Sequence, residues 1–307
     1  MDLMTLLPSR SSSKNFSTMI RKRFYLKLNI PTLLMILLFI FLCIRFLPST
    51  KCSSDTQEMK NKSKYRLVIL ILSSPDNLEW RATIRKTWLA QKYATVRHLF
   101  VIDSYGTLTK KVLYALKEIY EQYDFNYLMK CDDDSFVLVH KVLKELDKWD
   151  NKGTKKELYW GFFNGKASVK RSGPWKETDW ILCDYYLPYA LGGGYVLSYN
   201  LVKFIALNMD ILKLHKAEDV SIGLWLAPLA NIERKHDVRF DTEYRSRGCS
   251  NQYIVTHKQT ITNMKNMHEY HQASGELCVK ETRNRMSYQY NWTVPPSQCC
   301  NLQSGIP

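Results

Sequence analysis

Acidic residues are scarce in this sequence: 29 Asp and Glu stand against 44 Lys and Arg, which gives a formal net charge of +15. A strongly basic chain raises the expectation of nucleic-acid binding. Here, however, the basic residues are spread along the chain without the aromatic-plus-basic motifs of nucleic-acid modules. We therefore expect no nucleic-acid partner, whereas an acidic ligand such as a nucleotide phosphate or an anionic glycan suits the charge.

Other features are missing as well. The sequence has no internal repeat, which argues against a solenoid or propeller. None of its eight cysteines has zinc-ribbon spacing. In an oxidising compartment some cysteines should pair, and the adjacent Cys299 and Cys300 are each expected to find a distant partner. Apolar residues make up 45% of the 307 residues, so the chain is long and apolar enough for a globular domain with a sizeable core.

No long uninterrupted hydrophobic run is present either. The apolar run Leu33–Ile44 is short for a membrane span. Adding Phe24–Ile30 and Phe46–Leu47, with Lys27 and Arg45 reaching toward the headgroups, brings it to bilayer length. A cleaved signal peptide is the alternative, but the basic region ahead is long and no A-x-A-like cleavage site follows. We favour a retained signal anchor.

The charges around this run predict its orientation. Six basic residues and one acidic residue precede it, so the positive-inside rule predicts a cytosolic N-terminus and a lumenal remainder. This is the topology of a single-pass type II membrane protein. The predicted organisation is a cytosolic tail (1–28), a transmembrane anchor (29–47), a polar stem (48–64) and a lumenal domain (65–307).

Within the lumenal part, strand and helix patterns alternate. Apolar runs predict strands at 66–72, 98–102 and 126–129. Helical spacing of apolar residues predicts helices at 78–91, 108–123 and 139–149. The later half is less regular, with strands expected at 159–163, 195–198 and 253–257 and helices at 201–209 and 219–226. The alternation predicts an α/β domain with a largely parallel central sheet.

Three consecutive aspartates, Asp132, Asp133 and Asp134, follow the third predicted strand. Ligands of open α/β sheets bind at the carboxyl ends of the strands. Hard carboxylates suit Mg²⁺ and Mn²⁺, which in turn bridge phosphate oxygens. Helix capping explains one aspartate but not three, so we expect a metal site here.

Three further candidates are weaker when taken singly. Glu218 and Asp219 open a predicted helix, where they are either caps or the source of a general base. Gly192–Gly194 precede a predicted strand and indicate either a turn or a close approach of the backbone. His257 ends the last predicted strand, where a lone histidine is more often structural, although imidazole also binds Mn²⁺.

In order along the chain, six motifs resemble the β-1,3-glycosyltransferases of glycosyltransferase family 31. They are R-x-x-I-R-x-T-W (81–88), K-x-D-D-D-S-F (130–136), Y-W-G-F-F (159–163), Y-A-L-G-G-G-Y (189–195), E-D-V (218–220) and V-T-H-K-Q (255–259). As an ordered set they are far more specific than any one alone. Longer stretches at 183–198, 239–253 and 295–300 narrow the resemblance to the family member that extends the linker of proteoglycans.

The resemblance implies a Golgi type II membrane enzyme of glycosaminoglycan biosynthesis with a GT-A fold. Its donor would be UDP-galactose and its cofactor Mn²⁺. It would transfer galactose, with inversion, to the 3-hydroxyl of the terminal β-galactose in the galactosyl-xylosyl linker on proteoglycan core proteins. A homodimer, or a complex with other linker transferases, is also expected.

The resemblance also implies residue roles. Asp134 and His257 would be metal ligands, and Asp219 would be the catalytic base. Asp132 would contact the ribose or the metal shell. The other candidates would lie around the nucleotide and the two sugars: Arg81, Arg85, Asp133, Gly192, Gly193 and Gly194.

One feature departs from the family pattern near residues 102–103. Relatives carry a further helix and strand before a D-x-Y-x-N-L-T motif, which here reads as Asp103–Tyr105 and Leu108–Thr109, with Thr107 in place of asparagine. An exon-skipped or mispredicted gene product and a trimmed enzyme are both open explanations. We expect an exposed edge strand, lower stability and weaker activity.

Two other functions stay open from sequence. A non-catalytic Golgi membrane protein that retains the transferase fold would explain the missing unit. A lumenal metal-dependent hydrolase would need only the aspartates, a cation and water. The complete set of Asp134, Asp219 and His257 favours the transferase.

Overall fold

The computed structural model describes residues 30–31, 34–35, 37–39, 64–102 and 108–307. Residues 30–31, 34–35 and 37–39 are helical. No helix within these ranges is both long and apolar enough to cross a membrane. The predicted tail, most of the predicted anchor, nearly all of the stem and the motif at 103–107 lie outside the described residues.

A six-stranded mixed sheet in the order β2-β1-β3-β6-β5-β7 forms the centre of the domain that residues 64–102 and 108–307 build. Its strands are β1 (Lys64–Ser73), β2 (Val96–Ile102), β3 (Asp124–Asp132), β5 (Glu157–Asn164), β6 (Tyr189–Ser198) and β7 (Ile232–His236). Only β6 is antiparallel to its neighbours β3 and β5, whereas the β1–β2, β1–β3 and β5–β7 pairs are parallel. The predicted α/β domain is confirmed, and its sheet is mixed because β6 runs against the other five strands.

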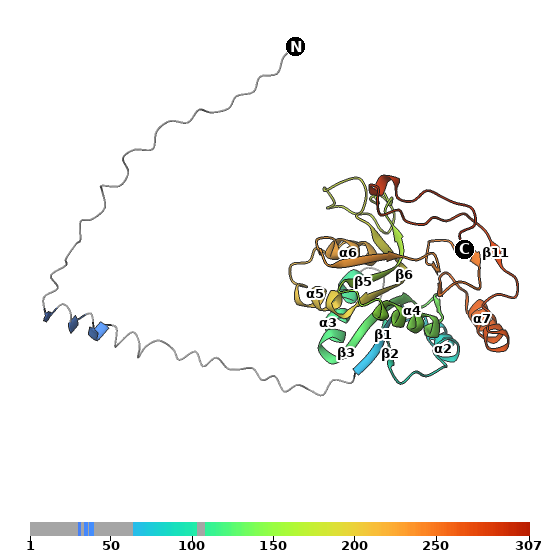
Figure 1. Cartoon of the computed structure of the whole chain (residues 1–307), viewed down its shortest axis with the longest axis horizontal. Helices are drawn as coiled ribbons and strands as arrows, with labels where there is room; N and C mark the ends of the chain where they lie inside the picture. Colours follow the sequence, from blue (N-terminus) through green and yellow to red (C-terminus); the bar gives the residue numbers. More distant parts are fainter. Residues whose placement is uncertain (1–29, 32–33, 36, 40–63, 103–107) are drawn as a thin grey trace, which may run out of the picture. The chain divides into compact units, whose positions relative to one another are not determined.

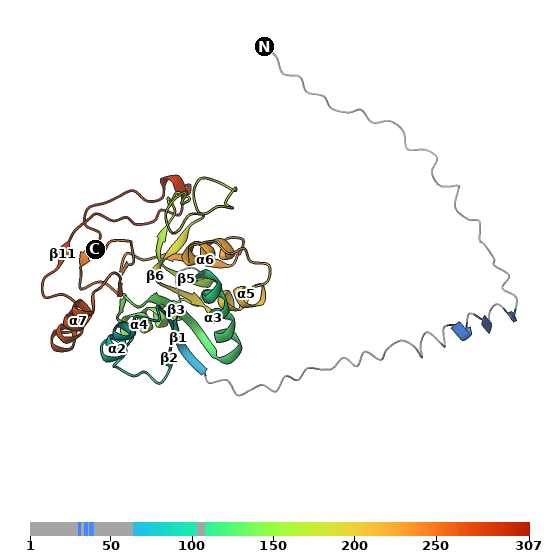
Figure 2. The same cartoon turned by 180° about the vertical axis from the view of Figure 1, so that it is seen from behind.

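Helices cover the sheet on two sides. On one side α3 (Leu108–Gln122), α5 (Tyr199–Leu207) and α6 (Glu218–Leu226) pack against one another and against β3 and β6. On the other side lie α2 (Leu78–Lys86) and α4 (Val139–Asn151), and α7 (Ile261–Ser274) packs on α2 (Figures 1 and 2). Leu67–Ile71 of β1 are fully buried between these layers, as their continuous apolar run predicts.

A smaller sheet joins the loop after β3 to the last third of the chain. It consists of β4 (Phe136–Val137), β10 (Val255–Thr256) and β8 (Phe240–Asp241), in the order β4-β10-β8. A two-stranded sheet of β9 (Gly248–Cys249) and β11 (Thr282–Arg283), and a 3₁₀ turn at Pro296–Gln298, complete the structure. The small three-stranded sheet positions the residues that follow β10 beside the aspartates.

Several predicted elements differ from those observed. Helix α2 ends at Lys86, not at residue 91, because the backbone leaves the helical conformation at Thr87, with φ −109° and ψ −109°. Strand β6 begins at Tyr189, six residues before the predicted start, so the three glycines lie inside the strand. The expected strand 253–257 is reduced to β10.

The expectation that Cys299 and Cys300 pair with distant cysteines is wrong. They form a disulfide with each other, and Cys249 pairs with Cys278. The two remaining cysteines of the described ranges are not paired: Cys131 is buried in β3, and Cys183 is exposed.

Candidate active site

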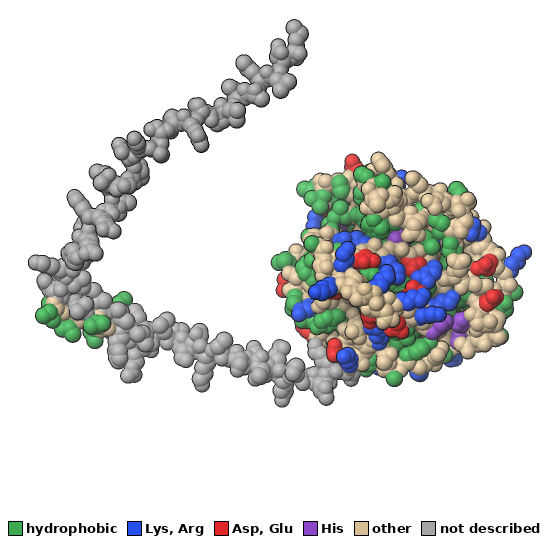
Figure 3. All heavy atoms as spheres, viewed as in Figure 1, with side chains coloured by type: hydrophobic (Ala, Val, Ile, Leu, Met, Phe, Trp, Pro, Cys, Tyr) green, Lys and Arg blue, Asp and Glu red, His purple; other side chains and the backbone are tan. Residues whose placement is uncertain are grey.

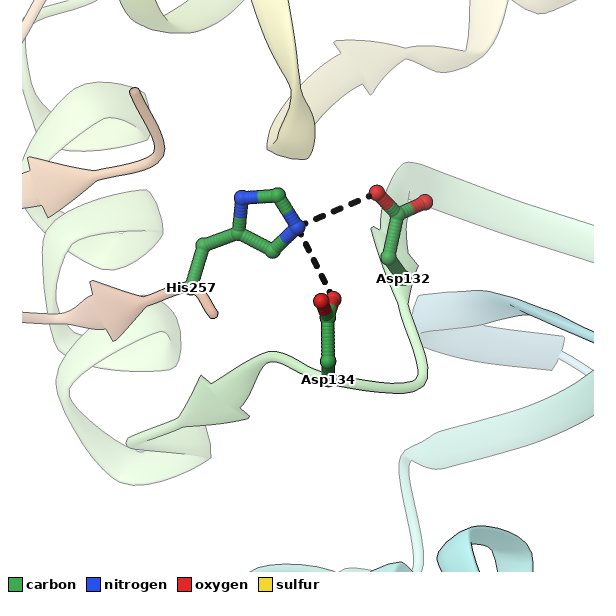
Figure 4. Close-up of side chains that lie close together, drawn as sticks. All are labelled: Asp132, Asp134 and His257. Carbon is green, nitrogen blue, oxygen red and sulfur yellow. Dashed lines mark ion pairs between the residues drawn. The ribbon is translucent and has the colours of Figure 1, made fainter. Parts of the chain in front are cut away.

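Asp132, Asp134 and His257 converge at the carboxyl end of β3. Antiparallel pairing of Thr256 with Phe136 brings the residue after β10 over the turn that follows β3. The Nε2 atom of His257 lies 2.8 Å from Asp134 Oδ1 and 3.4 Å from Asp132 Oδ2. Figure 4 shows the two aspartates, from the end of β3 and the turn after it, and His257, from the segment after β10, pointing toward one another.

This trio fits a divalent cation. One ligand atom from each residue lies within 4.8 Å of the others. Asp134 Oδ1 and His257 Nε2 are buried and make no hydrogen bond of acceptable geometry, although they face one another. Burial lowers the pKa of His257, but the two carboxylates outweigh it and raise the pKa to about 9. Two carboxylate oxygens and an imidazole nitrogen form a donor set that suits Mn²⁺, which would displace the imidazole proton.

Backbone contacts hold the ligand-bearing turn in place. Ser135 donates its hydroxyl to the Gly193 carbonyl at 2.6 Å, and the Gln259 amide donates to the Asp134 carbonyl at 2.9 Å. Lys258, between His257 and Gln259, has a positive φ of 61°, alone among the non-glycine residues in the described ranges. Its ammonium lies 3.0 Å from Asp134 Oδ2. Such backbone strain is typical of residues at functional sites.

The glycine run lies between the trio and the acid pair. A Cβ atom on Gly193 would lie 2.6 Å from the ring of His257. A Cβ atom on Gly192 would lie 3.3 Å from both Asp219 Oδ2 and Lys130 Nζ. Of the two alternatives left open by the sequence, close approach of the backbone is therefore the one observed.

Glu218 and Asp219 occupy the first turn of α6, but their environments differ. Glu218 is buried, accepts one hydrogen bond from the Tyr195 hydroxyl and lies 2.9 Å from Lys130 Nζ. Asp219 is half-buried and accepts from the amides of Gly192 at 2.9 Å and Val220 at 2.8 Å. Burial raises the pKa of Glu218 to about 7 and also raises the pKa of Asp219. Asp219 is thus the more accessible carboxylate, with increased basicity.

The structure also reveals a contact that the sequence reasoning did not find. Lys130 Nζ lies 2.9 Å from both Asp132 Oδ1 and Glu218 Oε2. A signal for it was present, because Lys130 is a lone positive charge between the apolar run 126–129 and the aspartates.

Three other predicted site residues lie around this centre rather than in it. Asp133 turns toward the loop after β1 and accepts from the Asn77 side-chain amide at 2.8 Å. Arg81 is buried and donates to Ser73 Oγ at the end of β1, at 2.8 Å, and to the backbone carbonyls of residues 74 and 75 in the same loop. Arg85 is exposed, with its guanidinium 4.5 Å from the centre of the Phe100 ring. Their proposed contacts with the nucleotide stay predictions.

Sequence comparison identifies the family. Residues 101–238 match the Galactosyltransferase family model. A mouse protein, "Beta-1,3-galactosyltransferase 6", is 41% identical over 280 residues, covering 80% of this chain and 86% of the relative. The chain belongs to the β-1,3-galactosyltransferases of glycosyltransferase family 31. It is therefore a glycosyltransferase, and the resemblance seen in its motifs is confirmed.

More distant relatives share the domain. "Hydroxyproline O-galactosyltransferase GALT2" of Arabidopsis thaliana is 28% identical over 65% of this chain, which spans about a third of that relative's length (34%). A glycosyltransferase involved in glycosylation of the major capsid of PBCV-1 overlaps 65% of this chain and 98% of its own, with a TM-score of 0.39 and 10% identity. That overlap is weak, so the fold description rests on the chain's own topology.

The alignment with the mouse relative contains gaps in this chain, because 80% of 307 residues is fewer than the 280 aligned positions. The relative therefore carries residues that this chain lacks. Strand β2, where the missing helix–strand unit is predicted to begin, is an edge strand of the sheet. The missing unit itself stays a prediction, since residues 103–107 lie outside the described ranges.

Proposed function

We propose that this protein transfers galactose from UDP-galactose to the 3-hydroxyl of a terminal β-galactose, with inversion and with Mn²⁺ as cofactor. The acceptor we propose is the galactosyl-xylosyl linker of proteoglycan core proteins. One observation carries the proposal. The trio Asp132, Asp134 and His257 lies on one side of the glycine run 192–194 of β6, and the half-buried Asp219 lies on the other. A site for a leaving diphosphate and a base for an incoming hydroxyl thus lie next to each other.

The charge on the protein surface suits this donor. The face drawn in Figure 3 carries Lys and Arg side chains gathered around acidic ones across its middle. Cationic side chains attract a nucleotide diphosphate, and the carboxylates would hold a hard divalent cation whose charge would offset that of the phosphates. A divalent cation held by Asp132, Asp134 and His257 would supply a Lewis acid that neutralises the departing UDP.

The chain's own groups account for the remaining chemistry. Asp219 accepts the proton of the acceptor 3-hydroxyl as that oxygen forms a bond to the anomeric carbon, while the bond from this carbon to UDP breaks on the opposite face. The amides of Gly192 and Val220 each donate to one Asp219 oxygen and fix the carboxylate's orientation. Burial raises the pKa of Asp219, which makes it a stronger base than an exposed aspartate.

We further propose a GT-A fold and a Golgi location with type II topology, in which residues 29–47 anchor the lumenal domain. The mixed α/β sheet with acidic residues at the end of β3 supports the first point. The basic residues ahead of the apolar run support the second. Self-association, or association with other linker transferases, belongs to the same proposal.

A transfer assay with two readouts tests the function. The full-length protein in detergent is incubated with UDP-galactose, Mn²⁺ and a galactosyl-β-1,4-xyloside, and both UDP release and product mass are measured. Galactose added to the acceptor supports the proposal. UDP release with free galactose would instead identify a hydrolase. A folded protein that binds UDP but forms no UDP from UDP-galactose would identify a non-catalytic relative.

A further inference from the structure

Lys130 occupies an unusual position for a lysine, because its side chain is only 2% exposed. Its ammonium lies within 2.9 Å of Asp132 Oδ1 and of Glu218 Oε2 and donates to the Gly192 carbonyl at 2.7 Å. Three acceptors match the three donors of an ammonium group. A buried lysine that satisfies every donor in this way is fixed in one geometry.

The sheet explains why these partners meet. Side chains alternate along a strand, so Lys130 and Asp132 point to the same face of β3. On that face Lys130 is paired across the strands with Tyr195 of β6, and the Tyr195 hydroxyl donates to Glu218. Helix α6 packs on β6 and brings Glu218 to the ammonium. Residues from β3, β6 and α6 therefore share one buried charge.

Each contact of Lys130 leads to a different part of the site. Asp132 belongs to the candidate metal trio. Gly192 donates its amide to Asp219, and Glu218 precedes Asp219 in the first turn of α6. We propose that Lys130 is a positioning residue that fixes the metal-binding turn and the catalytic base relative to each other. This inference rests on the proposed transferase function.

Loss of the Lys130 ammonium would change both the position and the pKa of Asp219. Removing the ammonium leaves Glu218 as a buried carboxylate without its cation and releases the Gly192 carbonyl, so Asp219 loses its fixed place. A displacement of about 1 Å in a catalytic group can lower the rate about 10²-fold. The ammonium also lowers the pKa of Asp219, so its loss raises the pH at which the base becomes protonated.

The test compares Lys130→Met and Lys130→Arg with Lys141→Met in the full-length protein. Lys141 is a matched control, because it is a part-buried lysine on α4 that donates to the Asn251 and Tyr253 carbonyls, outside the site. The measurements are kcat and KM as functions of pH, and calorimetric binding of UDP with Mn²⁺, which needs no turnover.

We expect Lys130→Met to lower kcat about 10²-fold and to move the acid limb of the kcat profile to higher pH. It should also weaken binding of UDP with Mn²⁺. Lys130→Arg should restore the position of the limb and part of the rate, and Lys141→Met should behave as wild type. A purely structural role for Lys130 would lower the amount of folded protein without moving the limb.

If Lys130→Met does not fold, the double variant with Glu218→Gln removes both charges of the Lys130–Glu218 pair, so that no carboxylate at position 218 is left buried without its cation. That variant should fold and still bind UDP with Mn²⁺ more weakly than wild type. Folded Lys130 variants with wild-type kcat, acid limb and UDP binding would overturn the inference. A wild type without transfer activity would contradict the proposed function, and UDP binding would still test Lys130.

Discussion

Gly193 and His257 are so close that any side chain on the glycine would meet the imidazole: a Cβ atom would lie 2.6 Å from its ring. The ring cannot retreat freely, because it is buried beside Asp132 and Asp134. The glycine run thus leaves room for the histidine of the metal trio. It also explains why strand β6 can cross the site directly beneath the residues that are proposed to bind the cation.

The first prediction concerns this contact. Gly193→Ala should displace the His257 ring and lower the apparent affinity for Mn²⁺ at least about 10-fold, because shifting the support of a metal ligand costs 10–100-fold in affinity. Gly192→Ala is the comparison, since its Cβ would lie at the longer distance of 3.3 Å from Asp219 Oδ2 and Lys130 Nζ. Titration of activity with Mn²⁺ should show the larger effect at Gly193. Equal Mn²⁺ dependence of both variants and wild type would refute this account of the glycine.

The second prediction concerns the ligands themselves. Asp134→Asn and His257→Ala should each weaken Mn²⁺ binding by about 10²-fold or more, and a chelator should abolish activity of the wild type. His98→Asn serves as a control, because His98 is a partly buried histidine on the edge strand β2. Calorimetric Mn²⁺ titration measures the affinity. Wild-type affinity in both ligand variants would mean that the cation binds elsewhere.

The third prediction concerns the pH dependence of activity. Burial raises the pKa of Asp219 above the ordinary aspartate value of 3.8, and this group must be ionised to accept the hydroxyl proton. The rate should therefore fall as pH decreases through a midpoint higher than 3.8. Stopped assays of kcat against pH locate the limb. The residual activity of Asp219→Asn should show no acid limb. An acid limb that persists unchanged in this variant would mean that another group titrates.

The fourth prediction concerns stability rather than activity. Burial raises the pKa of Glu218 from 4.5 to about 7, so the folded protein holds this proton more tightly than the unfolded chain. Stability from this group is therefore present at low pH and is lost as pH rises from about 4.5 to about 7, by about 3 kcal/mol at most. Glu218→Gln should remove this decline. Denaturant unfolding at pH 5 and pH 7.5 measures the loss of stability between the two pH values. An equal loss in variant and wild type would contradict the shifted pKa.

Long apolar runs and helical periodicity were sufficient to predict the first half of the fold. The continuous apolar run of β1 is buried, and the apolar residues of α3 recur at helical spacing on its buried face. Each pattern therefore predicts the element that the structure contains. Helix α7 was missed because only Met264 among its residues is buried, which leaves no apolar stripe to detect. Its caps were visible, with Thr260 at the start and Gly275 in the left-handed conformation at the end.

The candidate site, like the fold, could be predicted from the sequence only in part. The three aspartates, the acid pair and the glycine run could be found from sequence, because each breaks a local pattern. Their meeting could not, since it depends on the pairing of β4 with β10 and of β3 with β6. The role of Lys130 in that meeting was hidden, because its partners come from three separate elements of the fold. Strand β7, with the sequence IERKH, was missed because only Ile232 and His236 are buried there.

The central claim is that the metal trio and Asp219 act together in galactose transfer. The most direct test measures the mass of the product formed from a galactosyl-β-1,4-xyloside and UDP-galactose by wild type and Asp219→Asn, each with Mn²⁺ and with chelator. Wild type with Mn²⁺ should add one galactose. Chelator should abolish the product, and Asp219→Asn should bind UDP with Mn²⁺ normally yet form product at least about 10²-fold more slowly. Undiminished product from Asp219→Asn, or from wild type in chelator, would contradict the claim.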